Sequence, residues 1–87
     1  MKRIIATIQP FDIYQNICVY DGDKMVEKMQ AKMSEIPDTM MDLINTYAVE
    51  NIEMHGGSSQ FTSHIAQEIK EKELTKFNKN KINIKCF

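Results

Sequence analysis

The fold of this chain is constrained most by two adjacent glycines followed by two serines, Gly56–Ser59. They follow a short run that ends with Met54 and His55, and they precede a segment with helical periodicity. Paired glycines let the backbone turn tightly, and serine is favoured at a helix N-terminus. The pattern predicts a turn that connects a strand to a helix.

A strand-to-helix turn is also a candidate anion site. The first amides of a helix lack partners within the helix, and the dipole is positive at this end, so a phosphate is attracted there. The predicted anion-binding residues are Gln9, Gly56, Gly57, Ser58 and Ser59. A purely structural role is the interpretation we favour, because a glycine turn with a serine cap needs the same residues without a ligand.

Composition restricts the class of protein. The 87 residues suffice for one small domain, 1–87, and 43% hydrophobic with 26% charged residues is ordinary for a soluble globular protein. A net charge of -1 argues against general binding to nucleic acid or membranes. Arg3 is the single arginine among 11 basic residues, which argues against specific nucleic-acid readout.

The sequence also predicts the compartment of the protein and the state of its cysteines. The sequence has no apolar run long enough to cross a bilayer and no signal-peptide pattern, so we expect a cytoplasmic protein. Cys18 and Cys86 lack metal-type spacing, and a disulfide is not expected in a reducing compartment. We therefore expect no metal and no cofactor.

The first half of the chain predicts three strands. Ile4–Ile8 is apolar and ends before Pro10, and Ile13–Tyr20 alternates, with Ile13, Gln15, Ile17 and Val19 on one face. The Asp21-Gly22 pair predicts a hairpin, and hence a third strand from Lys24 to about Gln30. A helix over 24–33 remains an alternative, because methionines recur there every four residues.

The second half predicts helices and strands in alternation. The first helix would have Ser34 as its N-cap and Pro37 in its first turn, with an apolar stripe of Met40, Leu43, Ile44, Tyr47 and Ala48. A short strand over Asn51–Met54 leads into the glycine turn. The second helix would bury Phe61, Ile65 and Ile69, and a last strand would cover Lys81–Phe87.

This order, β-β-β-α-β-α-β, predicts an α/β fold. With right-handed crossovers, the five-stranded mixed sheet has strand order 3-2-1-4-5 and both helices on one face. The opposite face is then bare, and strand alternation gives it a mostly polar set: Arg3, Ile5, Thr7, Gln9, Tyr14, Asn16, Tyr20, Glu53, Asn83 and Lys85.

The bare face and the edge of the last strand form a candidate interface. The residues predicted to make it are Arg3, Ile5, Tyr14, Tyr20, Lys85 and Phe87. A small core gains stability from association, and an unpaired edge strand invites it. We expect a homo-oligomer or a complex with a protein partner.

The stretches Ile4–Pro10 and Ile17–Asp23, with this order of elements, resemble the ribonuclease-H-like fold of the RuvC-type resolvases. The resemblance implies metal-dependent cleavage of phosphodiesters, in which carboxylates hold divalent ions. That family places an aspartate at the end of the first strand, where this chain has Gln9. A second acid is typical near the end of the fourth strand, where the chain has Met54-His55-Gly56. We therefore expect no catalytic residues.

The expected function is that of a non-catalytic interaction or accessory protein acting through self-association or a protein partner. A binder of a nucleotide or another phosphate-bearing small molecule, using the Gly56–Ser59 turn, is the alternative, and a metal-dependent nuclease is the weaker alternative. The abundance of Lys, Ile and Asn is typical of small proteins from AT-rich bacteria and their phages, so we also expect a phage-like or mobile-element-like origin.

Overall fold

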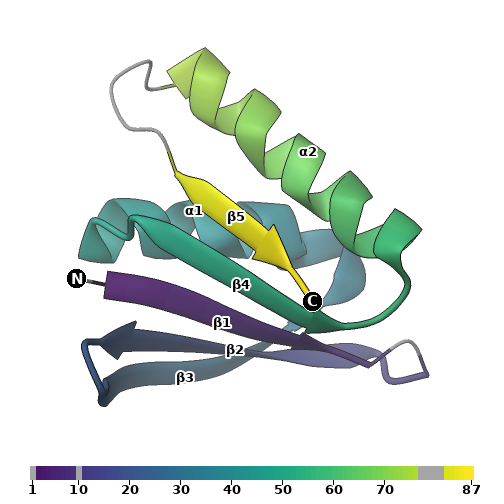
Figure 1. Ribbon diagram of the computed structural model, residues 1–87, viewed down its shortest axis with the longest axis horizontal. Helices are drawn as coiled ribbons and strands as arrows, with labels where there is room; N and C mark the ends of the chain where they lie inside the picture. Colours follow the sequence, from purple (N-terminus) through teal and green to yellow (C-terminus); the bar gives the residue numbers. More distant parts are fainter. Residues whose placement is uncertain (1, 10, 77–81) are drawn as a thin grey trace.

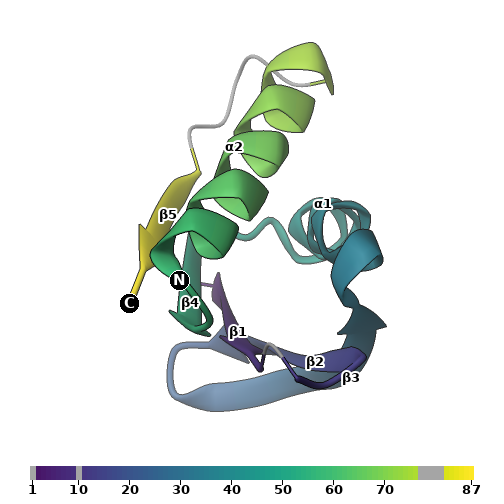
Figure 2. The same ribbon diagram turned by 90° about the vertical axis from the view of Figure 1, so that its right-hand side faces the viewer.

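A computed structural model of the chain describes residues 2–9, 11–76 and 82–87 and, for 72–76, the backbone alone. It has the predicted α/β fold: one mixed sheet of order β3-β2-β1-β4-β5 with two helices on one face (Figures 1 and 2). The elements are β1 (Lys2–Ile8), β2 (Tyr14–Asp21), β3 (Lys24–Lys32), the 3-10 helix η1 (Met33–Glu35), α1 (Ile36–Tyr47), β4 (Asn51–Gly56), α2 (Ser59–Lys76) and β5 (Asn83–Cys86).

The sheet is antiparallel on one side of β1 and parallel on the other. β1 pairs with β2, and β2 with β3, in antiparallel register, whereas β4 pairs in parallel with both β1 and β5. The hairpin turn lies at Gly22, whose φ is +64°, as the Asp-Gly pair predicted. Residues 24–32 are a strand and not a helix, and this strand continues two residues beyond Gln30.

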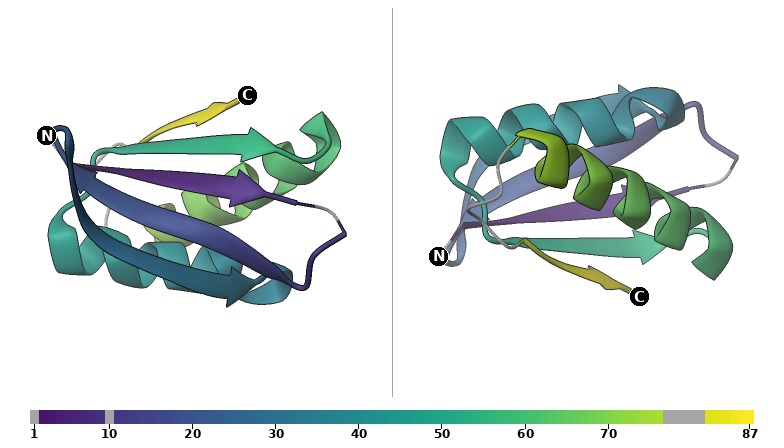
Figure 3. Two further views of the ribbon diagram at one scale, coloured as in Figure 1. Left: turned by 90° about the horizontal axis from the view of Figure 1, so that it is seen from below. Right: turned by 90° about the horizontal axis from the view of Figure 1, so that it is seen from above.

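The core lies between the sheet and the two helices (Figure 3). Alternate residues of the three inner strands are no more than 2% exposed: Ile4, Ala6, Ile8, Ile17, Val19, Ile52 and Met54. The helices cover them with buried side chains at helical spacing: Met40, Leu43, Ile44, Ile65 and Ile69. Burial of these side chains stabilises the fold because apolar surface is removed from water.

Four local predictions were wrong. The N-cap of α1 is Glu35 and not Ser34, because a 3-10 turn precedes the helix. Ala48 lies outside the apolar stripe, since it is the exposed C-cap with a left-handed φ of +55°. Ile13 lies before the strand and is 72% exposed. The last strand covers only Asn83–Cys86, and the predicted position Lys81 is outside the described residues.

Tyr47 connects the end of α1 to β3. Its side chain hydrogen-bonds Glu27, and this bond raises the pKa of Tyr47, with further contributions from desolvation and from the carboxylate charge. Glu27 pairs in register with Val19, so it points toward the helices. Tyr47, at the end of α1, therefore lies close to the outer strand β3.

The β1–β2 loop is organised by a fully buried glutamine. Gln15 Nε2 donates to the carbonyl oxygens of Gln9 and Asp12, both at 2.8 Å, while Gln15 Oε1 accepts from the Gln9 amide. The Asp12 amide also donates to the Gln9 carbonyl at 3.0 Å. The sequence places Gln15 on the core face but does not reveal this role. The buried amide replaces the strand pairing that would otherwise satisfy the loop.

We predict that Gln15→Leu lowers the free energy of unfolding by about 2 kcal/mol, because the loop carbonyls and the Gln9 amide lose their buried partner. The matched control is Gln30→Leu, which removes only an exposed hydrogen bond to Asn16 and should change the value by less than about 0.5 kcal/mol. Urea denaturation followed by circular dichroism measures both. Equal effects of the two substitutions would contradict a structural role for Gln15.

Candidate functional site

The glycine turn after β4 packs directly against the end of β1. Gly56 and Gly57 have φ values of +82° and +72°, and Gly56 pairs in register with Ile8. A Cβ at Gly56 would overlap the carbonyl oxygen of Ile8, and one at Gly57 would lie 2.9 Å from Ile8 Cγ2. Both glycines are therefore required by backbone conformation and by the close approach of two strands.

The serines that follow serve the N-terminus of α2. Ser58 Oγ accepts a hydrogen bond from the Phe61 amide at 3.1 Å, which is the usual N-cap contact. The hydroxyl of Thr62, a buried residue, donates to the Ser58 carbonyl at 3.1 Å. Ser58 thus has a structural task that needs no ligand, while Ser59 is the first residue of the helix and is exposed.

Gln9 follows β1 at the same end of the sheet as this turn. β1 and β4 are paired as far as Ile8 and Gly56, and both glycines of the turn approach Ile8 closely. The Gln9 side chain is exposed, and its backbone is held by Gln15. The structure therefore explains the turn by capping and packing. Anion binding by Gln9 and Gly56–Ser59 remains a prediction from sequence.

The opposite face of the sheet is not covered by any described element (Figure 3, left). Direct register partners form rows across it, and the middle row runs Lys28, Cys18, Ile5, Glu53, Lys85. The next row toward the end of β1 runs Gln30, Asn16, Thr7, His55. We call this surface the sheet face. Ile5 and Cys18 at its centre are half-buried among their neighbours.

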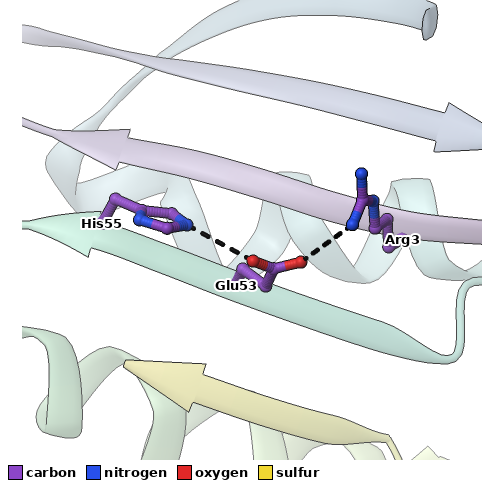
Figure 4. Close-up of polar contacts among 3 residues, drawn as sticks. All are labelled: Arg3, Glu53 and His55. Atoms are coloured by element: carbon purple, nitrogen blue, oxygen red, sulfur yellow. Dashed lines mark hydrogen bonds and ion pairs between the residues drawn. The ribbon is translucent and has the colours of Figure 1, made fainter. Parts of the chain in front are cut away.

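Glu53 is the polar centre of the sheet face (Figure 4). Its Oε2 accepts a hydrogen bond from Arg3 Nη1 at 3.4 Å, and its Oε1 lies 3.4 Å from His55 Nε2. The Glu53 side chain is only 23% exposed. Because β1 and β4 are parallel neighbours, Arg3 and Glu53 meet although they are far apart in the sequence.

Aromatic rings flank this polar centre. The Arg3 guanidinium lies 5.5 Å from the centroid of the Tyr20 ring, a cation–π distance. At the other end of β4, the His55 and Phe87 rings stack with centroids 4.6 Å apart and an interplanar angle of 9°. Phe87 nevertheless remains 65% exposed. The sheet face is therefore amphipathic, with flat rings beside charged groups.

The β1–β2 loop adds exposed apolar side chains at one end of this face. Phe11 is fully exposed, Ile13 is 72% exposed and Tyr14 is 52% exposed. Together with Asp12 and Gln30 they line a shallow depression. Gln15 donates hydrogen bonds to the backbone on which these side chains lie, through the carbonyl oxygens of Gln9 and Asp12.

The predicted interface residues are brought together. Arg3, Ile5, Tyr20 and Lys85 occupy register positions of the sheet face, Tyr14 lies at its end, and Phe87 packs on its edge. Sequence reasoning missed His55, although alternation from Glu53 places both on the same face. It also missed the lysines of β3, Lys28 and Lys32, because that strand was the least certain element.

Two kinds of feature are absent from the described residues. Among them, no group of three or more His, Cys, Asp or Glu residues could hold a metal ion. No helix in the described part of the chain has the length and apolar character needed to cross a membrane.

Comparison with known proteins gives a match in structure but not in sequence. No protein-family model and no curated protein matches the chain. A Bacteroides thetaiotaomicron VPI-5482 protein, described as having an actin-like ATPase fold and unknown function, superposes with a TM-score of 0.66 at 11% identity. The match covers 99% of this chain and 32% of that protein, so the chain spans about a third of its length.

This likeness shows the fold alone. The chain shares its α/β fold with part of a protein of actin-like ATPase fold, and the comparison does not confirm the ribonuclease-H-like resemblance. A second structure, PH0822, matches with a TM-score of 0.39 at 9% identity over 99% of this chain and 78% of the other. A TM-score this low adds nothing to the fold assignment.

We predict that Gly56→Ala lowers the free energy of unfolding by about 3 kcal/mol, since strain at positive φ is added to overlap with the Ile8 carbonyl. Gly22→Ala is the matched control. Gly22 also has a positive φ, but a Cβ at this position would meet nothing within 4 Å, so its cost should be about 1 kcal/mol. Urea titration separates the two, and a smaller loss at Gly56 than at Gly22 would show that packing against β1 is unimportant.

Proposed function

We propose that this protein is a non-catalytic interaction protein that binds a protein partner or another copy of itself through the sheet face. One observation carries the proposal: the sheet is covered by helices on one side, while the uncovered side combines a half-buried apolar centre with exposed aromatic rings. Ile5 and Cys18 form the centre, and Tyr14, Tyr20 and Phe87 surround it.

The strand directions support a covered state. Antiparallel sheets often expose one face to water, whereas parallel sheets usually have both faces buried. In this chain β1, β4 and β5 are parallel to one another, and the central strand directs Ile5 outward. A partner that covers this half would complete a layer that the described residues do not supply.

We propose that the chain has the fold of the ribonuclease-H-like resolvases and lacks the acidic residues of their catalysis. The order of elements supports the resemblance, and Gln9 stands where that family has a metal-binding acid. The Lys-, Ile- and Asn-rich composition supports a phage-like or mobile-element-like origin. We propose an accessory role in which the sheet face, and not a catalytic centre, is the functional surface.

Site-specific photo-cross-linking in cells tests this proposal. With p-benzoylphenylalanine in place of Thr7, an exposed residue on the sheet face, we expect covalent adducts to protein. The control position is Asp23 in the β2–β3 turn, which should give none. The adducts should disappear in Ile5→Lys, which places a charge at the centre of the face and leaves the helix-covered core intact.

Mass spectrometry identifies the adducts, and circular dichroism verifies that each variant is folded. Equal cross-linking from Thr7 and Asp23, or adducts from neither position, would refute the assignment of the sheet face as the binding surface.

A further inference from the structure

We propose that the sheet face is occupied by the α1 side of a second copy of this chain, so that copies stack head to tail. This inference rests on the proposed function, because it names the partner of the same face. It is based on opposite charges on the two sides of the molecule, which the net charge of -1 conceals.

The sheet face is cationic. Its register positions hold four basic residues and a single carboxylate, Glu53, which is already in contact with Arg3. Lys28 and Lys85 lie at the two ends of the central row, and Lys32 lies opposite Tyr14. Since the carboxylate is engaged within the face, the lysines define its outward charge.

The part of the helical side formed by η1 and α1 is anionic. The segment from Met33 to Tyr47, which forms η1 and α1, contains no Lys or Arg, and its three acids are all exposed: Glu35, Asp38 and Asp42. α2 is balanced in sequence, with Glu68, Glu71 and Glu73 against Lys70, Lys72 and Lys76, so the negative charge of this side comes from η1 and α1. The acids of α1 recur on one side of the helix, away from the core.

These charges favour a head-to-tail contact over a symmetric one. Two sheet faces placed against each other would bring lysines near lysines, which is unfavourable, whereas a sheet face against α1 pairs opposite charges. The two surfaces lie on opposite sides of the molecule (Figure 2). When two copies join through different surfaces, one sheet face and one α1 surface remain free on the pair. Further copies therefore add to form a stack, or the ends meet and close a ring.

The contact should be weak and sensitive to salt. The outer side of α1 is polar, with Asp42, Asn45 and Thr46 exposed, so attraction depends mainly on charge. Exposed ion pairs each contribute little and are screened by salt. We therefore expect assembly that grows with protein concentration at about 50 mM NaCl and dissociates at about 500 mM NaCl.

Two charge variants of the full chain test the arrangement. The sheet-face variant carries Lys28→Gln and Lys32→Gln, and the helix-face variant carries Glu35→Gln and Asp42→Asn, so each variant has one surface neutralised and not reversed. Each variant alone should self-associate about tenfold more weakly than the wild type. Asp23→Lys, in the β2–β3 turn, should assemble as the wild type does.

Mixing the two variants gives the decisive result. The sheet-face variant keeps intact helices, and the helix-face variant keeps an intact sheet face, so only one productive contact remains in the mixture. Sedimentation velocity and native mass spectrometry should show a 1:1 heterodimer and nothing larger. A wild-type protein that is monomeric at low salt, or a wild-type dimer whose variants fail to form the heterodimer, would overturn the inference.

A nucleic acid is the competing occupant of a cationic, aromatic surface. Fluorescence anisotropy with a labelled single-stranded DNA oligonucleotide tests it directly. Binding by the wild type that is lost in the sheet-face variant, while the wild type stays monomeric, would assign the face to nucleic acid and overturn self-assembly.

The result of the photo-cross-linking experiment separates this inference from the proposed function. Adducts from Thr7 to a different protein would preserve the sheet face as a binding surface and refute the second copy as its occupant. The absence of any adduct would refute both.

Discussion

The central position of β1 is the constraint on which the rest of the structure depends. It is hydrogen-bonded to β2 on one side and to β4 on the other, so its alternating side chains help to form both surfaces of the sheet. Ile4, Ala6 and Ile8 are buried beneath the helices, while Arg3, Ile5 and Thr7 belong to the sheet face. The register with β4 is limited at one end by the contact between Gly56 and Ile8.

One-sided coverage gives the protein two surfaces of different character. The helical side has a polar exterior that can remain in water, whereas the sheet face retains apolar and aromatic groups around the Arg3–Glu53 pair. Parallel pairing of β4 with both β1 and β5 makes full exposure of this face unusual. The residues of the glycine turn have structural roles. The sheet face is therefore a better candidate for a functional surface than the glycine turn.

Reasoning from the sequence was accurate for features that depend on residues close together in the chain. Alternation, the Asp21-Gly22 hairpin and the helical stripes gave the elements and most core residues, and the rule of right-handed crossovers then gave the strand order. It failed at positions where a side-chain contact or the end of a helix sets the backbone conformation. Ile13 lies outside its strand because Gln15 holds the preceding loop, and Ala48 ends the helix in a left-handed conformation.

The sequence by itself determined the order of elements, the sheet topology and the presence of a capped turn at Gly56–Ser59, since turn residues and periodicity act over short ranges. It also determined a net charge of -1, from which a lack of affinity for anionic partners was expected. Alternation placed Arg3 and Lys85 on the bare face, but only the tertiary structure completed the distribution of charge. Strand pairing gathers Lys28, Lys32 and Lys85 on one side, and the crossover helix α1 places Asp38 and Asp42 on the other. The side on which a charge lies depends on long-range pairing of strands, which composition does not record.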